Sequence, residues 1–155
     1  MEAGPARRLA DRRQGVSAMS TKIFVNLPVK DLVVTMGFFG GLDFKFDPRF
    51  TNEDAACMIV GEDIFVMLLV EEYFKTFTPK DICNAYHHTE AIIALSMESR
   101  KQVDEFVNRA LDAGASDYKE PVDEGPMYRW GFQDLNGHIW EILYMDMSQV
   151  PDVPA

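Results

Sequence analysis

The sequence is poor in cysteine, in histidine and in long apolar runs. Its 155 residues include two cysteines, Cys57 and Cys83, and three histidines. Because the cysteines match neither a CxxC motif nor a disulfide framework, they are predicted to be reduced thiols without a chemical role. No run approaches the roughly 18 to 20 apolar residues that cross a bilayer, and no apolar N-terminal segment resembles a secretory signal. These absences predict a cytoplasmic protein with no membrane partner.

Several motifs of catalysis and nucleotide binding are also absent. The sequence contains no P-loop, GxGxxG, GxSxG or HExxH pattern, so nucleotide binding, serine hydrolysis and zinc proteolysis have no support. The net charge is −10, from 25 acidic and 15 basic residues. A chain this acidic repels phosphate backbones, which argues against nucleic acid as a partner. A cationic or neutral small molecule fits the charge better.

The first residues differ in charge from the rest. Residues 1–18 hold four arginines but only two acidic residues. We predict that residues 1–20 form a disordered extension rather than a targeting or nucleic-acid-binding arm. The composition, 47% hydrophobic and 26% charged, suits one compact domain. We place that domain at residues 21–147, followed by a tail at residues 148–155.

The order of the predicted elements repeats along the chain. The first half reads as a strand, a helix that Asp31 caps and Gly40-Gly41 ends, and three strands at residues 43–50, 55–61 and 64–70. A linker at residues 73–88, with a short helical piece, precedes the second half. There a strand at residues 91–97 leads to a helix with a capping box of Ser99 and Gln102. That helix ends at Gly114, and three strands follow at residues 116–122, 127–134 and 138–145.

Each half therefore reads as one βαβββ module. Module one spans residues 21–72 and module two spans residues 89–147. Two such modules in one small chain predict an α+β fold, in which curved mixed sheets surround a groove. Whether the modules pair within one chain or swap between two chains stays open at this point.

The segment from Asp134 to Leu143 places a carboxylate inside an apolar strand. Strand alternation puts Glu141 on one face with Ile139 and Leu143, and His138 on the other face. A carboxylate among aliphatic side chains is costly unless a cation, a metal or hydrogen-bond donors meet it. Glu141 is therefore either paired with a basic side chain or is the polar anchor of a ligand groove.

The repeated order and several motifs resemble the vicinal oxygen chelate superfamily. This group includes glyoxalase I, extradiol dioxygenases, fosfomycin-resistance enzymes and bleomycin-resistance proteins. The motifs are NLPVKDL at the start, IIALSM at the restart, and F-x-D-x-x-G-x-x-x-E at the end, here Phe132, Asp134, Gly137 and Glu141. The resemblance covers about residues 21–145. It implies a small-molecule partner and a homodimer, and it leaves the activity open because the group spans several chemistries.

In the metal-dependent members of this superfamily, the first and last strands of each half supply metal ligands. Carried over by position, these sites fall at Phe24, Met67, Ile92 and Glu141. Only Glu141 has a donor atom, and one carboxylate alone does not hold a divalent ion tightly. The resemblance therefore implies no cofactor for this chain. The alternative is a divalent metal (Zn, Ni, Fe or Mn) at a rearranged site of Glu141 with His88 and Glu90, whereas solvent exposure is the plainer interpretation of His88.

The other candidates for the groove are an amide and two aromatic side chains. Asn26 shares strand parity with Phe24, and it either orients a ligand or makes a structural hydrogen bond. Tyr128 and Trp130 alternate with Phe132 on one strand. They either form the floor of a ligand pocket or pack against a helix or a dimer partner.

Two functions follow from these patterns. The favoured one is a metal-independent small-molecule-binding protein of the bleomycin-resistance type, a dimer with two clefts that Glu141 and aromatic side chains anchor. The alternative is a metal-dependent lyase or dioxygenase of the glyoxalase I or extradiol type, with Glu141 as metal ligand or base. Whether the chain is an enzyme is left open.

Overall fold

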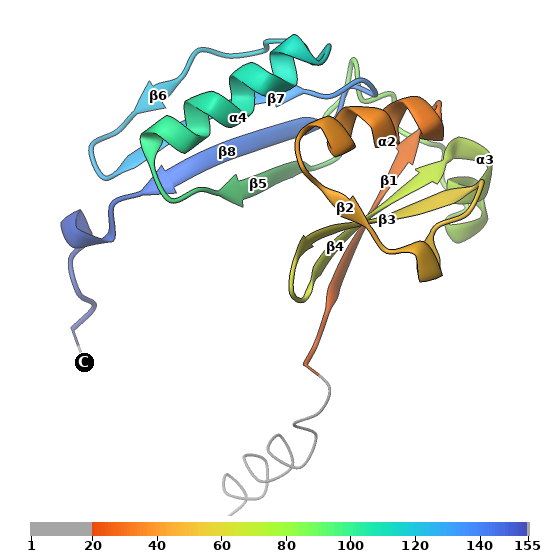
Figure 1. Cartoon of the computed structure of the whole chain (residues 1–155), viewed down its shortest axis with the longest axis horizontal. Coiled ribbons are helices and arrows are strands. Elements are labelled where there is room, and N and C mark those ends of the chain that lie inside the picture. The colour runs from red at the N-terminus through yellow and green to blue at the C-terminus, as the bar shows by residue number, and fades with distance from the viewer. Residues whose placement is uncertain (1–19, 155) are drawn as a thin grey trace, which may run out of the picture.

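The computed structural model describes residues 20–154 and contains two βαβββ modules (Figure 1). Nearly all of the predicted N-terminal extension, residues 1–19, lies outside the described residues. Module one contains β1 (Ile23–Val29), α2 (Leu32–Gly41), β2 (Lys45–Phe46), η1 (Pro48–Phe50), β3 (Ala55–Gly61) and β4 (Ile64–Val70). Module two contains β5 (Ile92–Ser96), α4 (Arg100–Asp112), β6 (Val122–Asp123), β7 (Met127–Gln133), β8 (Ile139–Met145) and η3 (Met147–Gln149). This arrangement confirms the predicted α+β fold.

The two sheets have the same strand order. Sheet A runs β1-β4-β3-β2 and sheet B runs β5-β8-β7-β6, so the first strand of each module lies at a sheet edge. That first strand pairs in parallel with the last, and the remaining pairs are antiparallel. The registers also correspond, because Phe24 is opposite Phe65 in sheet A and Ile92 is opposite Ile139 in sheet B.

Both long helices begin at the capping residues that the sequence predicts. The Asp31 carboxylate accepts from the Val34 N–H at 3.1 Å, and the Ser99 hydroxyl accepts from the Gln102 N–H at 3.1 Å. These contacts satisfy N–H groups that lack a partner within the first turn of a helix. The Gln102 side chain accepts from the Glu98 N–H at 3.0 Å, one residue earlier than a capping box predicts. None of the helices within residues 20–154 is long and apolar enough to cross a membrane.

The second strand of each module is much shorter than predicted. In module one, β2 has two residues, and a 3₁₀ turn begins at Pro48. Pro48 has no N–H for a sheet, and the Asp47 carboxylate accepts from the Arg49 N–H at 3.0 Å, which favours the turn. In module two, β6 also has two residues and follows Pro121, with one isolated bridge upstream at Ser116. The long predicted strands at residues 43–50 and 116–122 were therefore wrong.

Aromatic side chains join the two modules into one core. The Phe39 ring of α2 lies 5.1 Å from the Trp140 ring of β8, and the Phe38 ring lies 6.1 Å from that of Phe132 in β7. Phe39, Phe132 and Trp140 are fully buried. Both α2 and α4 lie on the same side of the molecule (Figure 1). The helix-covered faces of both sheets therefore share one core.

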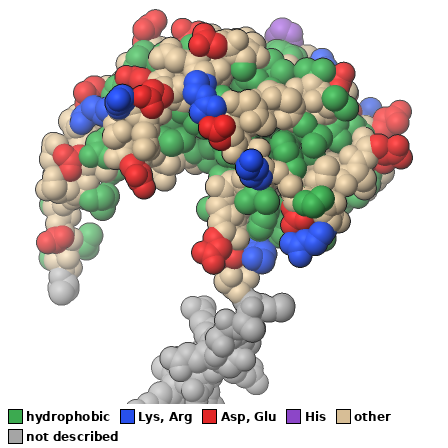
Figure 2. Space-filling model, viewed as in Figure 1, with side chains coloured by type: hydrophobic (Ala, Val, Ile, Leu, Met, Phe, Trp, Pro, Cys, Tyr) green, Lys and Arg blue, Asp and Glu red, His purple; other side chains and the backbone are tan. Residues whose placement is uncertain are grey.

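The molecule is hollowed between the modules (Figure 2). Side chains of β1, β3, β4, β5 and α4 line a cavity there of about 880 Å³. Three isoleucines at this cavity are about half exposed: Ile23 at 54%, Ile64 at 46% and Ile92 at 57%. We call the surface formed by these three residues the apolar hollow.

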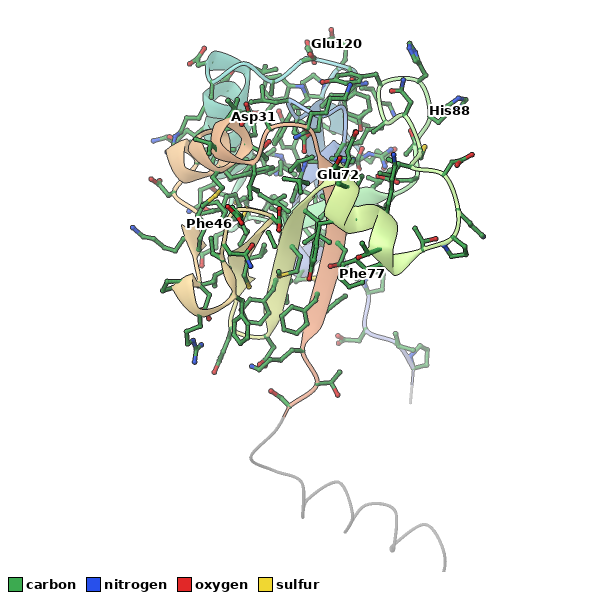
Figure 3. The ribbon with its side chains drawn as sticks, turned by 90° about the vertical axis from the view of Figure 1, so that its right-hand side faces the viewer. Asp31, Phe46, Glu72, Phe77, His88 and Glu120 are labelled. Carbon is green, nitrogen blue, oxygen red and sulfur yellow. The ribbon has the colours of Figure 1, made fainter. Side chains whose placement is uncertain are left out.

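The linker begins with the predicted helical piece, α3 (Glu71–Phe74), which continues into the 3₁₀ turn η2 (Lys75–Phe77). This segment lies beside the face of sheet A that α2 does not cover, where Glu72 and Phe77 mark it in Figure 3. The remaining linker crosses to module two and packs on the turn before β8.

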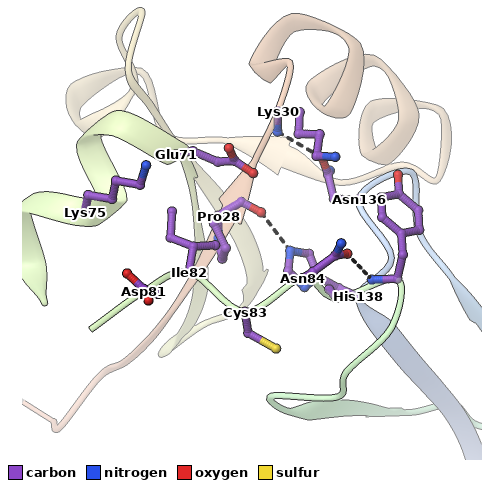
Figure 4. A pocket seen from close by; sticks show the side chains of 12 residues that line it. Pro28, Lys30, Glu71, Lys75, Asp81, Ile82, Cys83, Asn84, Asn136 and His138 are labelled. Atoms are coloured by element: carbon purple, nitrogen blue, oxygen red, sulfur yellow. Dashed lines mark hydrogen bonds between the residues drawn. The ribbon is translucent and has the colours of Figure 1, made fainter. Parts of the chain in front are cut away.

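That turn, Asp134 to His138, ties module two to the end of β1 (Figure 4). The Asn136 side chain accepts from the Lys30 N–H at 3.0 Å and donates to the Thr35 hydroxyl at 3.1 Å. The His138 Nε2 atom donates to the Pro28 carbonyl at 2.7 Å. A polar cavity of about 350 Å³ lies beside these contacts, under the linker. Hydrogen bonds between side chains and backbone thus fix how the modules meet.

Buried ionisable groups hold the turn itself. The Asp134 carboxylate accepts from the N–H groups of Asn136 and His138 and from the Trp140 indole at 2.8 Å. Burial raises the pKa of Asp134, although these donors and His138 oppose the rise. The His138 Nδ1 atom lies 3.2 Å from the Glu90 carboxylate, so both ring nitrogens face oxygen acceptors. The His138 ring thus lies between Glu90 and the end of β1.

We expect the Gly137→Ala variant to lose about 2 to 4 kcal/mol of unfolding free energy. Gly137 has φ of +86°, and an added Cβ would lie 2.7 Å from the Tyr86 backbone nitrogen. Gly125 is a matched control, because its φ is +82° but nothing lies within 4 Å of an added Cβ. Gly125→Ala is expected to lose only about 1 kcal/mol in urea unfolding. Equal losses in the two variants would contradict a close approach of the linker.

Candidate functional site

Three predicted groove residues, Phe24, Asn26 and Met67, come together on sheet A. Asn26 is opposite Met67 in the register of β1 and β4, and the Phe24 ring stacks on Phe65 at 4.9 Å. Strand alternation directs them away from α2, because Leu27 is buried in the core on the other face. We call the surface of Phe24, Asn26, Phe65 and Met67 the outer face of module one. Its Phe24 side chain is 48% exposed.

Two further predicted residues, Ile92 and Glu141, come together on sheet B. Glu141 lies between Ala94 of β5 and Gly131 of β7, and Ile92 is two residues before Ala94 on the same face. Trp140, which alternates with Glu141, is fully buried in the shared core. We call the surface of Ile92, Ala94, Gly131 and Glu141 the outer face of module two.

The Glu141 carboxylate meets a tyrosine. The Tyr118 hydroxyl donates to Glu141 Oε1 at 3.2 Å. Burial and the neighbouring Glu141 charge raise the pKa of Tyr118 to about 12, which keeps the phenol protonated as a donor. Among residues 20–154, no lysine or arginine lies within ion-pair distance of Glu141, and no hydrogen bond reaches its Oε2 atom. This second oxygen is available to accept from a ligand.

A glycine makes room for that tyrosine. An added Cβ at Gly131 would lie 3.0 Å from Cε1 of the Tyr118 ring and 2.5 Å from the Trp140 carbonyl oxygen. Sequence reasoning did not assign Tyr118 to the site, because it expected an ordinary strand there. The available signal was Gly131 itself, since a glycine between Trp130 and Phe132 in a strand often marks a close approach.

Arg129 adds a cation to the same face of sheet B. It is opposite Leu143, two residues along the strand from the pair of Gly131 and Glu141 and therefore on the same face. Its Nη2 atom lies 3.4 Å from the Glu124 carboxylate, and its buried Nε has no hydrogen-bond partner within the described residues. This part of sheet B thus offers a carboxylate, a phenol and a guanidinium to a bound molecule.

The predicted groove residues Tyr128 and Trp130 lie elsewhere. They alternate with Gly131 and Arg129, and they pack against the shared core on the face that α4 covers. The Tyr128 hydroxyl donates to the Asp104 carboxylate of α4 at 2.5 Å, and burial with this contact raises the pKa of Tyr128 to about 12. The structure places both in sheet-to-helix packing, which is one of the two interpretations that the sequence left open.

The residues of the rearranged metal site, His88, Glu90 and Glu141, do not form one cluster. His88 is exposed in the linker, while the Glu90 carboxylate lies against His138. Within residues 20–154, no three His, Cys, Asp or Glu side chains lie close enough to hold a metal ion. His88, Glu90 and Glu141 therefore do not form a ligand set. Neither cysteine is in a disulfide, and burial raises the pKa of the Cys57 thiol.

The two outer faces of one chain border different cavities: Asn26 and Met67 line the one of about 390 Å³, and Ile92 and Ala94 line the one of about 880 Å³. Val66 and Leu68 of sheet A and Trp140 and Ile142 of sheet B belong to one buried cluster. The outer faces lie on the opposite sides of their sheets from this cluster, because neighbouring residues in a strand point to opposite faces. The cavity that Met67 lines contains no residue of sheet B, so Glu141 does not contribute to it within the described residues.

No protein-family model and no curated protein matches this sequence. Solved structures do match it. A hypothetical protein from S. aureus is 26% identical, with a TM-score of 0.70, over 81% of this chain and 95% of that one. A glyoxalase/bleomycin resistance protein/dioxygenase family enzyme from Burkholderia phytofirmans is 15% identical, with a TM-score of 0.68, over 81% of this chain and 99% of that one.

A third match is the fosfomycin resistance protein FosX from Mesorhizobium loti. It is 15% identical, with a TM-score of 0.61, over 84% of this chain and 97% of that chain. The chain has the vicinal oxygen chelate fold. At these identities the matches show the fold and leave the activity undetermined.

The donor set of this chain does not fit a catalytic divalent ion. Of the four positions that the resemblance implies as ligands, Phe24, Met67 and Ile92 carry apolar or thioether side chains. Glu141 is the one oxygen donor, and one of its oxygens already accepts from Tyr118. Zinc, nickel, iron and manganese sites need three or more nitrogen, oxygen or thiolate donors.

We expect two tyrosines of the folded protein to ionise at about pH 12, and Tyr118→Phe to remove one of them. A tyrosine with a raised pKa stabilises the fold below its ordinary pKa of 10.0, and this stability is lost as the pH rises toward 12. Tyrosinate absorbance in the near ultraviolet measures both ionisations. Glu141→Gln should lower the pKa of Tyr118 and leave that of Tyr128 unchanged. A Tyr118 pKa that is the same in Glu141→Gln and in the wild type would contradict the contact between Tyr118 and Glu141.

Proposed function

We propose that the protein binds a small molecule, without a metal ion, in grooves assembled between two copies of the chain. Each groove is formed by the outer face of module one from one copy and the outer face of module two from the other. The observation that carries this proposal is that, within residues 20–154, the cavity on the outer face of module one, beside Met67, has no residue of module two in its lining. A partner copy supplies the half of the groove that each chain lacks.

The apolar hollow supports the contact between copies. Its isoleucines Ile23, Ile64 and Ile92 lie about half exposed around one cavity. The edge strands β1 and β5 border it, and each edge has a row of backbone groups that no strand within residues 20–154 pairs. Apolar side chains beside open strand edges are typical of a surface that another chain covers.

The polar groups of module two support a ligand that donates hydrogen bonds. Glu141 Oε2 has no partner among the described residues, and Tyr118 holds Oε1 in place. The net charge of −10 attracts cations toward the molecule. A planar cation such as an amidinium group is the best complement of a carboxylate oxygen in an apolar surrounding.

We expect the protein to sediment as a dimer and the Ile64→Asp variant to dissociate about 10-fold or more readily. An aspartate in the apolar hollow would have to be buried without a partner when two copies meet. Val33→Asp is the control, because Val33 is 79% exposed on α2, away from the hollow. Sedimentation equilibrium compares the three proteins. A wild-type monomer, or equal dissociation of both variants, would contradict the proposed interface.

We expect p-aminobenzamidine to bind more tightly than the neutral p-aminobenzamide, and Glu141→Gln to remove this preference. The loss of one charge-assisted hydrogen bond corresponds to an affinity about 10-fold weaker, measured by probe fluorescence. Equal affinity for both probes in the wild type would contradict Glu141 as the anchor. About one divalent ion per chain, lost in Glu141→Gln, would instead favour the metal-dependent enzyme.

Mixing two defective variants tests the shared groove directly. Glu141→Gln damages the half from module two, and Met67→Glu damages the half from module one. Random exchange of subunits makes half of the dimers mixed, with one intact groove each, so about a quarter of all grooves recover binding. No recovery after subunit exchange would place both halves in one chain.

A further inference from the structure

A separate cavity of about 390 Å³ opens on the outer face of module one. Met67 and Leu69 of β4 and Ala55 of β3 form its apolar part, and Asn26 of β1 lies beside them. Leu69 and Ala55 are buried, at 1% and 6% exposure. The cavity thus has a fixed floor that the sheet provides, and it belongs wholly to module one.

Aromatic side chains from two separate segments surround this cavity. Phe50 comes from η1, and Tyr73 and Phe77 come from α3 and η2. The Tyr73 and Phe77 rings meet edge to face at 5.1 Å, and the Arg49 guanidinium lies 5.5 Å from the centre of the Phe50 ring. All three rings are exposed, at 59% for Phe50, 39% for Tyr73 and 63% for Phe77. Apolar rings in water around an open cavity lose solvent contact when a flat molecule enters.

The lining of this cavity is close to neutral in charge. It contains no carboxylate, and its one cation, Arg49, forms an ion pair with Asp47 at 2.8 Å. Contacts within the chain also use most of its polar atoms, because the Thr51 hydroxyl donates to the Asp47 carbonyl and accepts from the Cys57 N–H. Asn26 donates to the Phe24 carbonyl at 3.3 Å, and no hydrogen bond within residues 20–154 reaches its Oδ1 atom. One amide oxygen at the edge is therefore available to accept from a ligand.

We infer that this cavity is a subsite for a planar, uncharged aromatic ring with a hydrogen-bond donor that reaches Asn26. The inference rests on the proposed function and deepens it by naming the class of ligand. The ring lies among Phe50, Tyr73 and Phe77, and a basic group of the same ligand extends to Glu141 of the partner copy. The ligand is thus an aromatic molecule with one neutral and one cationic end.

Two amides of equal polarity test the ring. Benzamide is planar, and cyclohexanecarboxamide has the same amide on a puckered ring. Titration of the full chain, followed by saturation-transfer NMR, should show tighter binding of benzamide. Phe77→Leu and Tyr73→Leu should each weaken benzamide about 2- to 10-fold, because an aromatic contact of this kind is lost. Phe77→Tyr keeps the ring and should retain the affinity.

Val33→Ala serves as the control for loss of an exposed apolar side chain, because Val33 lies on α2 outside the cavity. It should bind benzamide as the wild type does. Equal affinity for the two amides would overturn the inference, as would a Phe77→Leu variant that binds like Phe77→Tyr. Because the mutated rings are exposed, circular dichroism should show all variants folded.

The outcomes also separate this subsite from the proposed groove. Benzamide bears no charge, so Glu141→Gln should leave its binding unchanged. If the ring variants have no effect while p-aminobenzamidine still depends on Glu141, the subsite is wrong and the proposed function stands. If the ring variants weaken benzamide binding while Glu141→Gln leaves p-aminobenzamidine binding unchanged, the subsite stands without the groove between copies.

Discussion

The packing of Phe38 and Phe39 against Phe132 and Trp140 is the contact on which the other features depend. It joins the helix-covered faces of both sheets, and strand alternation then directs Met67 and Glu141 away from this core. The turn from Asp134 to His138 holds this arrangement through contacts with β1 and α2. The interior of one chain is complete in this way, whereas its outer faces are left open.

The two outer faces differ in chemistry although they share one register. Module one presents rings, a thioether and an amide, and module two presents a carboxylate that a tyrosine positions. Glu141 occupies the place that Met67 has in module one, since each is two residues beyond the partner of Phe24 or Ile92. The proposed groove therefore combines apolar contact from one copy with polar contact from the other.

The order of elements, the helix caps and the doubled modules could be predicted because they follow from local patterns of residues. The short length of β2 and β6 could not be predicted, because Pro48 and Pro121 oppose pairing only where they meet a neighbouring strand. Tyr118 was missed for the same reason, since its position depends on a broken strand folding over Gly131. Alternation showed which side chains share a face, but it does not show how two sheets pack, so the separate cavities beside the two outer faces required the structure.

The doubled module has an evolutionary consequence. A repeated unit supplies the same backbone positions twice, so one copy can lose a chemical property while the other retains it. Here module one has Met67 where module two keeps Glu141, although the two sheets hydrogen-bond alike. In the proposed groove, drift in either unit would then change the contacts to one end of the ligand at a time, and specificity could diversify without any change in the scaffold.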